Sequence, residues 1–190
     1  MSMYRIIATA VALALSAGAV DARALKLKLA SPQPKSVKSG LAVQYAFPSD
    51  VQSLRDAYIA IGVGAKPGKP LKGLDYLSSK REPGALTSGQ EHKVAAKIDG
   101  YIRFDEPGVY TLEVYSNDGL DLSIGGYEIA KVDKKRSCDP IGAVDVNIRK
   151  AGWYAVEGLY WQRKGSSCLI MEWSKDGSEL ETVPASLYGH

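Results

Sequence analysis

The chain has 190 residues, which is the size of one domain and enough to bury an ordinary core. Its 24 lysines and arginines nearly balance its 21 aspartates and glutamates, and the formal net charge is +3. A dedicated nucleic-acid binder would carry basic residues in clear excess, so nucleic acid is not expected as a partner.

The first 24 residues have the composition of a cleaved signal peptide. Arg5 supplies a short positive start, residues 6–19 are apolar, and Ala22 to Ala24 form an A-x-A cleavage site. The apolar run is shorter than the roughly 20 residues that a membrane helix needs, and no later stretch qualifies. We expect cleavage after Ala24, with Ala22 as the alternative, no membrane span in the mature chain, and a periplasmic or secreted protein.

Residues 25–39 are predicted to form an N-terminal strand and a linker ahead of the domain, which we place at residues 40–190. The stretch 25–29 alternates leucine with lysine, as an edge strand does. The stretch 31–36 contains two prolines and is typical of an extended linker.

The first part of the domain mixes strand candidates with one irregular stretch. A core strand is expected over 40–47, followed by a single helical turn capped by Ser49 or Asp50. Residues 57–63 are a further strand candidate. Residues 64–91 are rich in Gly, Pro, Lys and Ser and show little periodicity, which favours a long solvated connection.

The middle of the chain, residues 100–126, alternates apolar and polar residues with a period of two. The alternation is broken at Pro107-Gly108, Asp118-Gly119 and Gly125-Gly126, a pattern typical of antiparallel strands joined by tight turns. Similar runs predict strands over 94–104, 127–132, 141–150, 153–162 and 168–173. The expected fold class is all-β, an antiparallel β-sandwich or a partly closed barrel.

The two cysteines, Cys138 and Cys168, predict one disulfide in an exported chain. Closing a loop of this length contributes about 3 to 4 kcal/mol in the chain-entropy model. A reactive thiol would need a nearby histidine, and the two histidines are His92 and the C-terminal His190. The structural disulfide is therefore favoured.

Several short motifs follow one another over most of the mature chain: Gly40–Tyr45, Lys97–Ile102, Pro107–Tyr110, Ser116–Gly119, Ile124–Gly126, Ala151–Tyr154, Tyr160, Gly165, Leu169, Trp173 and Val183–Leu187. Each motif alone is unspecific. The ordered set resembles the PA14 domain, a β-sandwich module first named in anthrax protective antigen and found in glycosidases, yeast adhesins and exported bacterial proteins.

This resemblance implies a calcium site. In the sugar-binding adhesins of the family, two adjacent aspartates joined by a cis peptide hold a calcium ion that binds sugar hydroxyls. Asn117 and Asp118 stand at this position and are the implied metal ligands; Asn117 offers a carbonyl oxygen but removes one negative charge, so weaker binding is expected. The chain also departs from the family pattern at Ile98, where Trp is frequent, and at Gly125, where Asp is frequent.

The candidate ligand-binding residues are Asn117, Asp118, Asp121 and Asp176. We expect the turn at 175–177 to face Asn117-Asp118 at one end of the sandwich. The same residue types also suit turns that bind nothing, because Asn and Asp tolerate left-handed backbone and Gly supplies a positive φ. Asp121 equally fits a solvent-facing strand position, so turn and ligand site remain alternatives.

Two further groups of residues suit a sugar ligand. Aromatic stacking platforms on one strand are offered by Trp153, Tyr154, Tyr160 and Trp161. One face of a sandwich strand must be core, so only one parity pair can face solvent. An anionic glycan or a lipid headgroup suits Lys131, Lys134, Lys135 and Arg136, and a solvated loop explains these basic residues equally well.

No enzyme is predicted. Catalysis by a nucleophile and a base needs a positioned partner, and His92 lies in a polar loop without a recognisable motif. The expected function is an exported, non-catalytic module that binds carbohydrate through loops at one end of the sandwich, with Ca²⁺ as the implied cofactor. The alternative is an envelope structural or protein–protein interaction domain with neither metal nor sugar.

Overall fold

The computed structural model describes residues 24–79 and 84–190. The predicted signal peptide, apart from Ala24, lies outside the described residues. The strands are β1 (Leu25–Lys26), β2 (Ala42–Ala46), β3 (Lys66–Pro67), β4 (Asp75–Leu77), β5 (Val94–Phe104), β6 (Gly108–Ser116), β7 (Gly119–Ile124), β8 (Tyr127–Val132), β9 (Asp139–Ile148), β10 (Gly152–Gln162), β11 (Cys168–Lys175), β12 (Glu181–Thr182) and β13 (Tyr188–Gly189). The helices are α1 (Leu54–Gly64) and the short 3-10 helix η1 (Ala185–Leu187).

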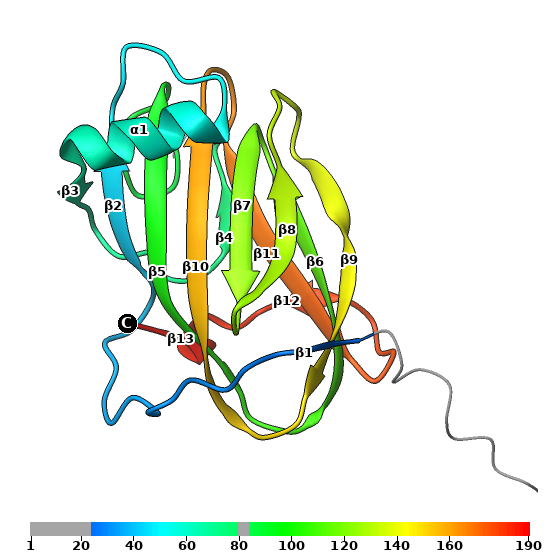
Figure 1. Ribbon diagram of the computed structural model, residues 1–190. Coiled ribbons are helices and arrows are strands. Elements are labelled where there is room, and N and C mark those ends of the chain that lie inside the picture. The colour runs from blue at the N-terminus through cyan, green and yellow to red at the C-terminus, as the bar shows by residue number, and fades with distance from the viewer. Residues whose placement is uncertain (1–23, 80–83) are drawn as a thin grey trace, which may run out of the picture.

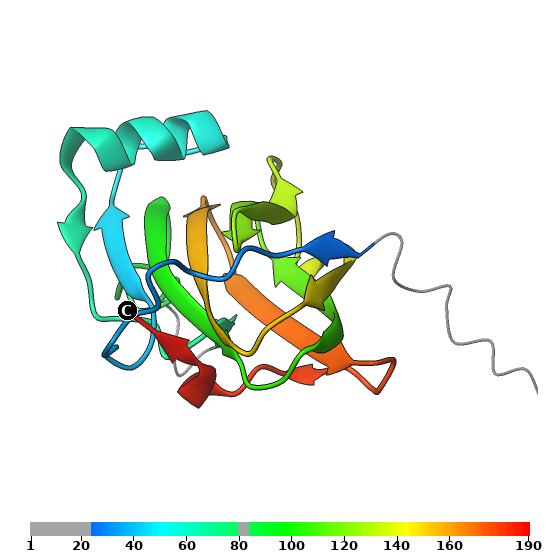
Figure 2. The ribbon, with the colours of Figure 1, turned by 60° about the horizontal axis from the view of Figure 1, so that its bottom comes forward.

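Within the described residues the strands form two sheets that pack face to face (Figures 1 and 2). The first sheet has six strands in the order β1-β9-β6-β11-β12, with β4 beside β11. The second sheet has seven strands in the order β3-β2-β5-β10-β7-β8, with β13 beside β5. The predicted antiparallel sandwich is confirmed, and the sheets are not closed into a barrel.

Most consecutive strands cross from one sheet to the other. β6 pairs with β9 and β11, whereas β7 pairs with β8 and β10. Residues 117–118 therefore connect the two sheets, and the prediction that they form a hairpin tip is wrong. The turns at 125–126 and 176–180 do join neighbouring antiparallel strands, β7 to β8 and β11 to β12.

The core lies between the sheets and is built from alternate residues of each strand. In β6 and β7 the buried apolar residues are Tyr110, Leu112, Val114, Leu120, Leu122 and Ile124. The predicted period-two alternation thus identifies the core face. In β10, Tyr154 and Tyr160 point into the same core.

Helix α1 begins after Ser53, whose hydroxyl accepts a hydrogen bond from the N–H of Asp56 at 3.1 Å. The predicted caps Ser49 and Asp50 lie upstream of this position, so the predicted cap is wrong. The helix also runs for 11 residues instead of a single turn. Among the residues that the structure describes, no helix is long and apolar enough to span a membrane.

The helix lies outside the sandwich, across the face of β2, β5 and β10 (Figures 1 and 2). Ala57 is fully buried in a second apolar cluster that includes Trp161, and Leu54 and Ile61 pack at the margin of the cluster. These spacings of three and four residues place one apolar stripe on a helix face. The predicted strand over 57–63 is therefore wrong.

The N-terminal segment follows the domain closely. Leu25–Lys26 forms a parallel strand beside β9 at the edge of the first sheet, in line with the predicted edge strand. The Lys28 N–H donates to the Gly125 carbonyl at 3.0 Å. Farther on, the Gln33 amide bonds both the N–H and the carbonyl of Trp153, at 2.9 and 3.0 Å.

Candidate functional site

Three loops that cross between the sheets meet at one end of the sandwich. They are residues 117–118 after β6, residues 133–138 after β8 and residues 163–167 after β10. Figure 1 shows the ends of β8 and β10 pointing to this end, on the same side as α1. We call the three loops together the clasp end.

A single carboxylate links two of these loops. Asp118 Oδ1 accepts a hydrogen bond from the Arg136 N–H at 3.2 Å, and Oδ2 accepts one from the Arg163 N–H at 2.7 Å. The Asp118 residue is only 4% exposed. Bonds from backbone N–H groups to a buried carboxylate are charge-assisted, so Asp118 holds the second and third loops side by side.

Asn117 adds contacts to the second loop and to the first residue of β11. Its Nδ2 donates to the Arg136 carbonyl at 2.9 Å, and its N–H donates to the Cys168 carbonyl at 3.2 Å. The predicted disulfide is confirmed, with Cys138 and Cys168 Cα atoms 5.8 Å apart, and it joins the ends of the two loops covalently. Asn117 Oδ1 is buried and has no hydrogen-bond partner in the described part of the chain.

The backbone at this corner differs from the predicted turn. Asp118 has a φ of 55°, whereas Gly119 is not among the residues of positive φ. Glycine is required at 119 for another reason: a Cβ there would lie 1.9 Å from Nε1 of Trp161. Among the described residues the cis peptide is Ser31-Pro32, so the Asn117-Asp118 peptide is trans, unlike the pair that the resemblance implies.

Two further acidic residues at the clasp end bind protein groups. Asp133 Oδ1 accepts from the Leu54 N–H at 2.7 Å and from the Trp161 Nε1–H at 3.2 Å. Asp50 forms two hydrogen bonds with the Arg163 guanidinium, at 2.9 and 3.1 Å. The Arg163 hydrogen bond is the main reason that the pKa of Asp50 falls to about 2.

The lysines of these loops, by contrast, face solvent. Lys134, Lys135 and Lys164 are exposed, and their ammonium groups form no hydrogen bond or ion pair with any described residue. The Arg136 guanidinium donates to the Pro140 carbonyl at 2.9 Å. The solvent-facing surface of the two longer loops is therefore predominantly positive.

A buried hydroxyl lies beneath the clasp end. The Tyr160 side chain is fully buried, and its hydroxyl has no hydrogen-bond partner among the described residues. Burial is the largest cause of its raised pKa, and the nearby Asp118 carboxylate raises the pKa further. Tyr160 therefore stays neutral and serves as core, not as an exposed sugar platform.

The other aromatic side chains of β10 are also largely covered. Tyr154 lies in the core between the sheets, and Trp161 is fully buried beneath α1. Trp153 is half-buried, with the Tyr101 ring 6.5 Å away and the Arg103 guanidinium 5.6 Å from its ring. The parity argument separated the two pairs but did not say which pair is core, and it did not predict the helix that covers Trp161.

The remaining predicted ligand residues do not join this site. Asp121 forms an ion pair with Lys131 at 2.7 Å on the neighbouring strand. Asp176 Oδ1 accepts from the Val109 N–H at 3.2 Å, beside the start of β6. Because Asp118 follows the end of β6, the two turns lie at opposite ends of the sandwich, and the prediction that they face each other is wrong.

The donor set at the clasp end does not fit calcium. Ca²⁺ takes about six to eight oxygen ligands. Both Asp118 oxygens accept backbone N–H groups, and Asn117 Oδ1 is a single neutral donor. In the described part of the chain, no group of three or more His, Cys, Asp or Glu residues is placed to hold a metal ion.

Sequence reasoning missed the residues that build this corner from a distance, namely Asp50, Asp133 and Arg163. Asp133 and its partner Leu54 are 79 residues apart, and Asp50 and Arg163 are 113 residues apart, so no local pattern indicates these contacts. One signal was present: two short basic runs, 134–136 and 163–164, follow strands that end at the same side of the fold.

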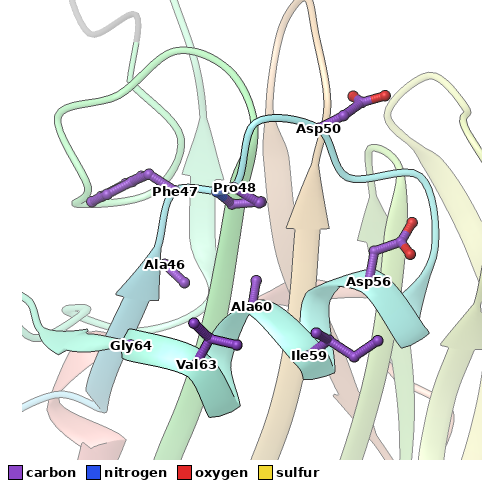
Figure 3. Close-up of a pocket in the computed structure, with 9 residues that line it drawn as sticks. All are labelled: Ala46, Phe47, Pro48, Asp50, Asp56, Ile59, Ala60, Val63 and Gly64. Atoms are coloured by element: carbon purple, nitrogen blue, oxygen red, sulfur yellow. The ribbon is translucent and has the colours of Figure 1, made fainter.

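A groove of about 440 Å³ lies beside the clasp end, between α1 and residues 46–50 (Figure 3). Figure 3 shows Ala60 pointing from the helix towards the loop, whereas the Asp50 carboxylate is turned away from the helix. A smaller cavity of about 210 Å³ lies at the opposite end and includes Tyr110, Trp173 and Lys175 in its lining.

Comparisons with solved structures show where this architecture recurs. The PA14 domain of the MpAFP antifreeze protein superposes with a TM-score of 0.66 and 18% identity, over 82% of this chain and 93% of that chain. A PA14 sugar-binding domain from an RTX adhesin gives 0.61 and 18%, over 82% and 99%. The Epithelial Adhesin 9 A domain from Candida glabrata, in complex with Galβ1-4GlcNAc, gives 0.67 and 14%, over 87% and 95%. At these identities the likeness shows the fold.

The sequence comparisons address the family directly. A search of curated proteins found no match. The family model of the PA14 domain matches residues 78–186, which is more than half of the chain and spans β5 to β12. The chain belongs to the PA14 domain family.

Proposed function

We propose that the protein is an exported, non-catalytic module that binds carbohydrate at the clasp end. The observation that carries the proposal is the Asp118 carboxylate, which fixes two loops whose lysines face solvent. A surface fixed in this way offers donors for sugar oxygens without ordering loops on binding. Family membership and the sugar-bound adhesin domains of the same fold support this choice of ligand.

One pair of carboxylates faces across neighbouring strands. Glu113 and Glu172 are register partners in β6 and β11. Both accept from the Tyr115 hydroxyl, at 2.8 and 3.3 Å, and the Glu113 bond leads the causes that raise the pKa of Tyr115 to about 12. Neither acid lines one of the two cavities described above.

The test is a glycan-array screen of the mature protein, followed by calorimetry on the hits with Asp118→Asn and with Asp121→Asn as the matched control. We expect a glycan whose affinity falls in Asp118→Asn and is unchanged in the control, because Asp121 lies outside the clasp end. Failure of every glycan class, in calcium and in chelator alike, would overturn the proposal.

A second candidate function is docking of an envelope protein on α1. The outer side of the helix leaves Tyr58, Ile59 and Val63 exposed by 74, 51 and 84%, and exposed apolar clusters of this kind mark interaction surfaces. The helix precedes the residues matched by the family model. The fitting partner is an apolar segment with a basic residue, since Asp56 lies at one end of the groove.

This candidate is distinguished by variants of the helix. Docking on α1 is favoured if an envelope protein binds stoichiometrically and this binding is lost in Val63→Asp. The same binding should be retained in clasp-end variants and be unaffected by sugars. Retention of the same partner in Val63→Asp would exclude the helix as the docking surface.

A further inference from the structure

We propose that the clasp end binds an acidic carbohydrate, one carrying carboxylate, sulfate or phosphate groups, and that it does so without a metal ion. This inference rests on the proposed function and specifies the ligand class. Three observations lead to it: three acids at this end bind protein groups, three lysines are exposed and unpaired among the described residues, and the loops are held rigidly.

The first step concerns negative charge. Asp118, Asp133 and Asp50 point at backbone N–H groups, at an indole N–H and at a guanidinium, respectively. Each of these three acids thereby binds a group of the protein. Two acids in or next to these loops are exposed, Asp133 and Asp139, the first residue of β9.

The second step concerns positive charge. Lys134 and Lys135 in one loop and Lys164 in the other are exposed and unpaired among the described residues. The Arg136 and Arg163 N–H groups bind the same carboxylate, which brings the two loops that carry these lysines together. Neighbouring like charges raise the local positive potential, which attracts anions and repels Ca²⁺.

The third step concerns rigidity. Asp118 and the Cys138–Cys168 disulfide both join the two lysine-bearing loops. Because these loops are already ordered in the folded protein, ligand binding does not cost the conformational entropy of ordering them. The positive charge that a bound metal would otherwise present to the ligand is supplied here by lysines on fixed loops.

The experiment is calorimetric titration of the mature protein with four oligosaccharide probes of similar length: sulfated, uronic-acid, phosphorylated and neutral. Each titration is run in chelator and in calcium. The test variant combines Lys134→Ala, Lys135→Ala and Lys164→Ala. The matched control combines Lys26→Ala, Lys35→Ala and Lys150→Ala, which removes the same charge from exposed positions at the opposite end.

We expect at least one acidic probe to bind in chelator, with affinity reduced roughly tenfold in the test variant and unchanged in the control. Equal loss in both variants would overturn the assignment to the clasp end. Inorganic sulfate or phosphate that bound as tightly as the oligosaccharide would overturn the carbohydrate part of the inference.

The outcomes also separate this inference from the proposed function. Binding of the neutral probe alone, and only in calcium, would leave the carbohydrate module standing and overturn the acidic, metal-free ligand. Failure of all four probes in both conditions would overturn both. Because the lysines are exposed, the test variant is expected to melt within a few degrees of the parent protein, so loss of binding reports the surface.

Discussion

Asp118 combines a negative charge, near-complete burial and two backbone N–H donors from separate loops. A buried carboxylate is costly unless its oxygens are satisfied, and here each oxygen accepts one bond. The residue also holds a φ of 55°, which Asp and Asn tolerate better than other side chains. The fold therefore depends both on the charge of Asp118 and on its left-handed backbone conformation.

The Asp118→Asn substitution separates these two roles. The amide tolerates the same φ but can accept on only one side, so one backbone N–H loses its partner and the charge is lost. We expect the free energy of unfolding to fall by about 2 to 3 kcal/mol in denaturant titrations. Asp121→Asn, which breaks an exposed ion pair, should cost less than about 1 kcal/mol; equal effects would contradict the role given to Asp118.

The ion pair of Asp50 with Arg163 should make the stability of the protein depend on pH. Its folded pKa is about 2, below the ordinary 3.8, chiefly because of the Arg163 hydrogen bond. The pair therefore stabilises the protein above pH 3.8, and this contribution is lost as the pH falls towards 2. Melting temperatures of wild type and Asp50→Asn should differ at neutral pH and converge in this acidic range. A difference that persists at pH 2 would show that the pair is not its cause.

At the scale of elements, α1 covers part of the outer face of the second sheet, over β2, β5 and β10. It covers Trp161, and Trp161 in turn contacts Asp133 through its indole N–H. The Leu54 N–H at the first turn donates to the same carboxylate at 2.7 Å. The helix start and the clasp end are thus joined at Asp133.

The N-cap of α1 can be tested directly. Ser53→Ala removes the hydroxyl that accepts the Asp56 N–H, and such caps contribute about 1 kcal/mol. Chemical denaturation should show this loss. Ser49→Ala is the matched control, because Ser49 is exposed and its side chain caps nothing; a loss there as large as in Ser53→Ala would place the helix start elsewhere.

This helix also shows where sequence patterns reach their limit. Tyr58, Ile59 and Val63 make the outer side of the helix apolar, so the covered stripe with Ala57 and Ile61 does not stand out in the sequence. The β-branched and aromatic composition favours a strand, whereas packing against the sheet favours a helix. The covered stripe could be recognised only once its partner, a residue 100 positions later, was known.

At the scale of the whole molecule, the strands and their core faces were predictable, whereas their partners were not. Period-two alternation located β5 to β11 to within a few residues, because one face of every strand is buried. The Asp-Gly sequence at 118–119 suits a hairpin, yet the chain crosses between sheets there. Pairing depends on contacts distant in sequence, so the separation of Asp118 from Asp176 could not be read from the turns themselves.

The disulfide provides a prediction at this scale. Its two cysteines are separated by 30 residues, and the crosslink restricts the unfolded chain. Replacing both with alanine should lower the free energy of unfolding by about 3 to 4 kcal/mol. Amide exchange in 133–138 and 163–167 should also speed up relative to the parent protein, and by more than in the core strands. The reason is that these loops lose the disulfide and keep the Asp118 hydrogen bonds. Unchanged exchange would mean that Asp118 alone fixes them.

The central claim is that the Asn117-Asp118 corner joins loops and does not hold a metal ion. The most direct measurement is calorimetric titration of Ca²⁺ into the chelator-stripped mature protein, with the melting temperature recorded in calcium and in chelator. We predict no binding heat and the same melting temperature in both, because the Asp118 oxygens already accept the Arg136 and Arg163 N–H groups. Micromolar calcium binding that disappears in Asp118→Asn would contradict the claim and restore this corner as a metal site.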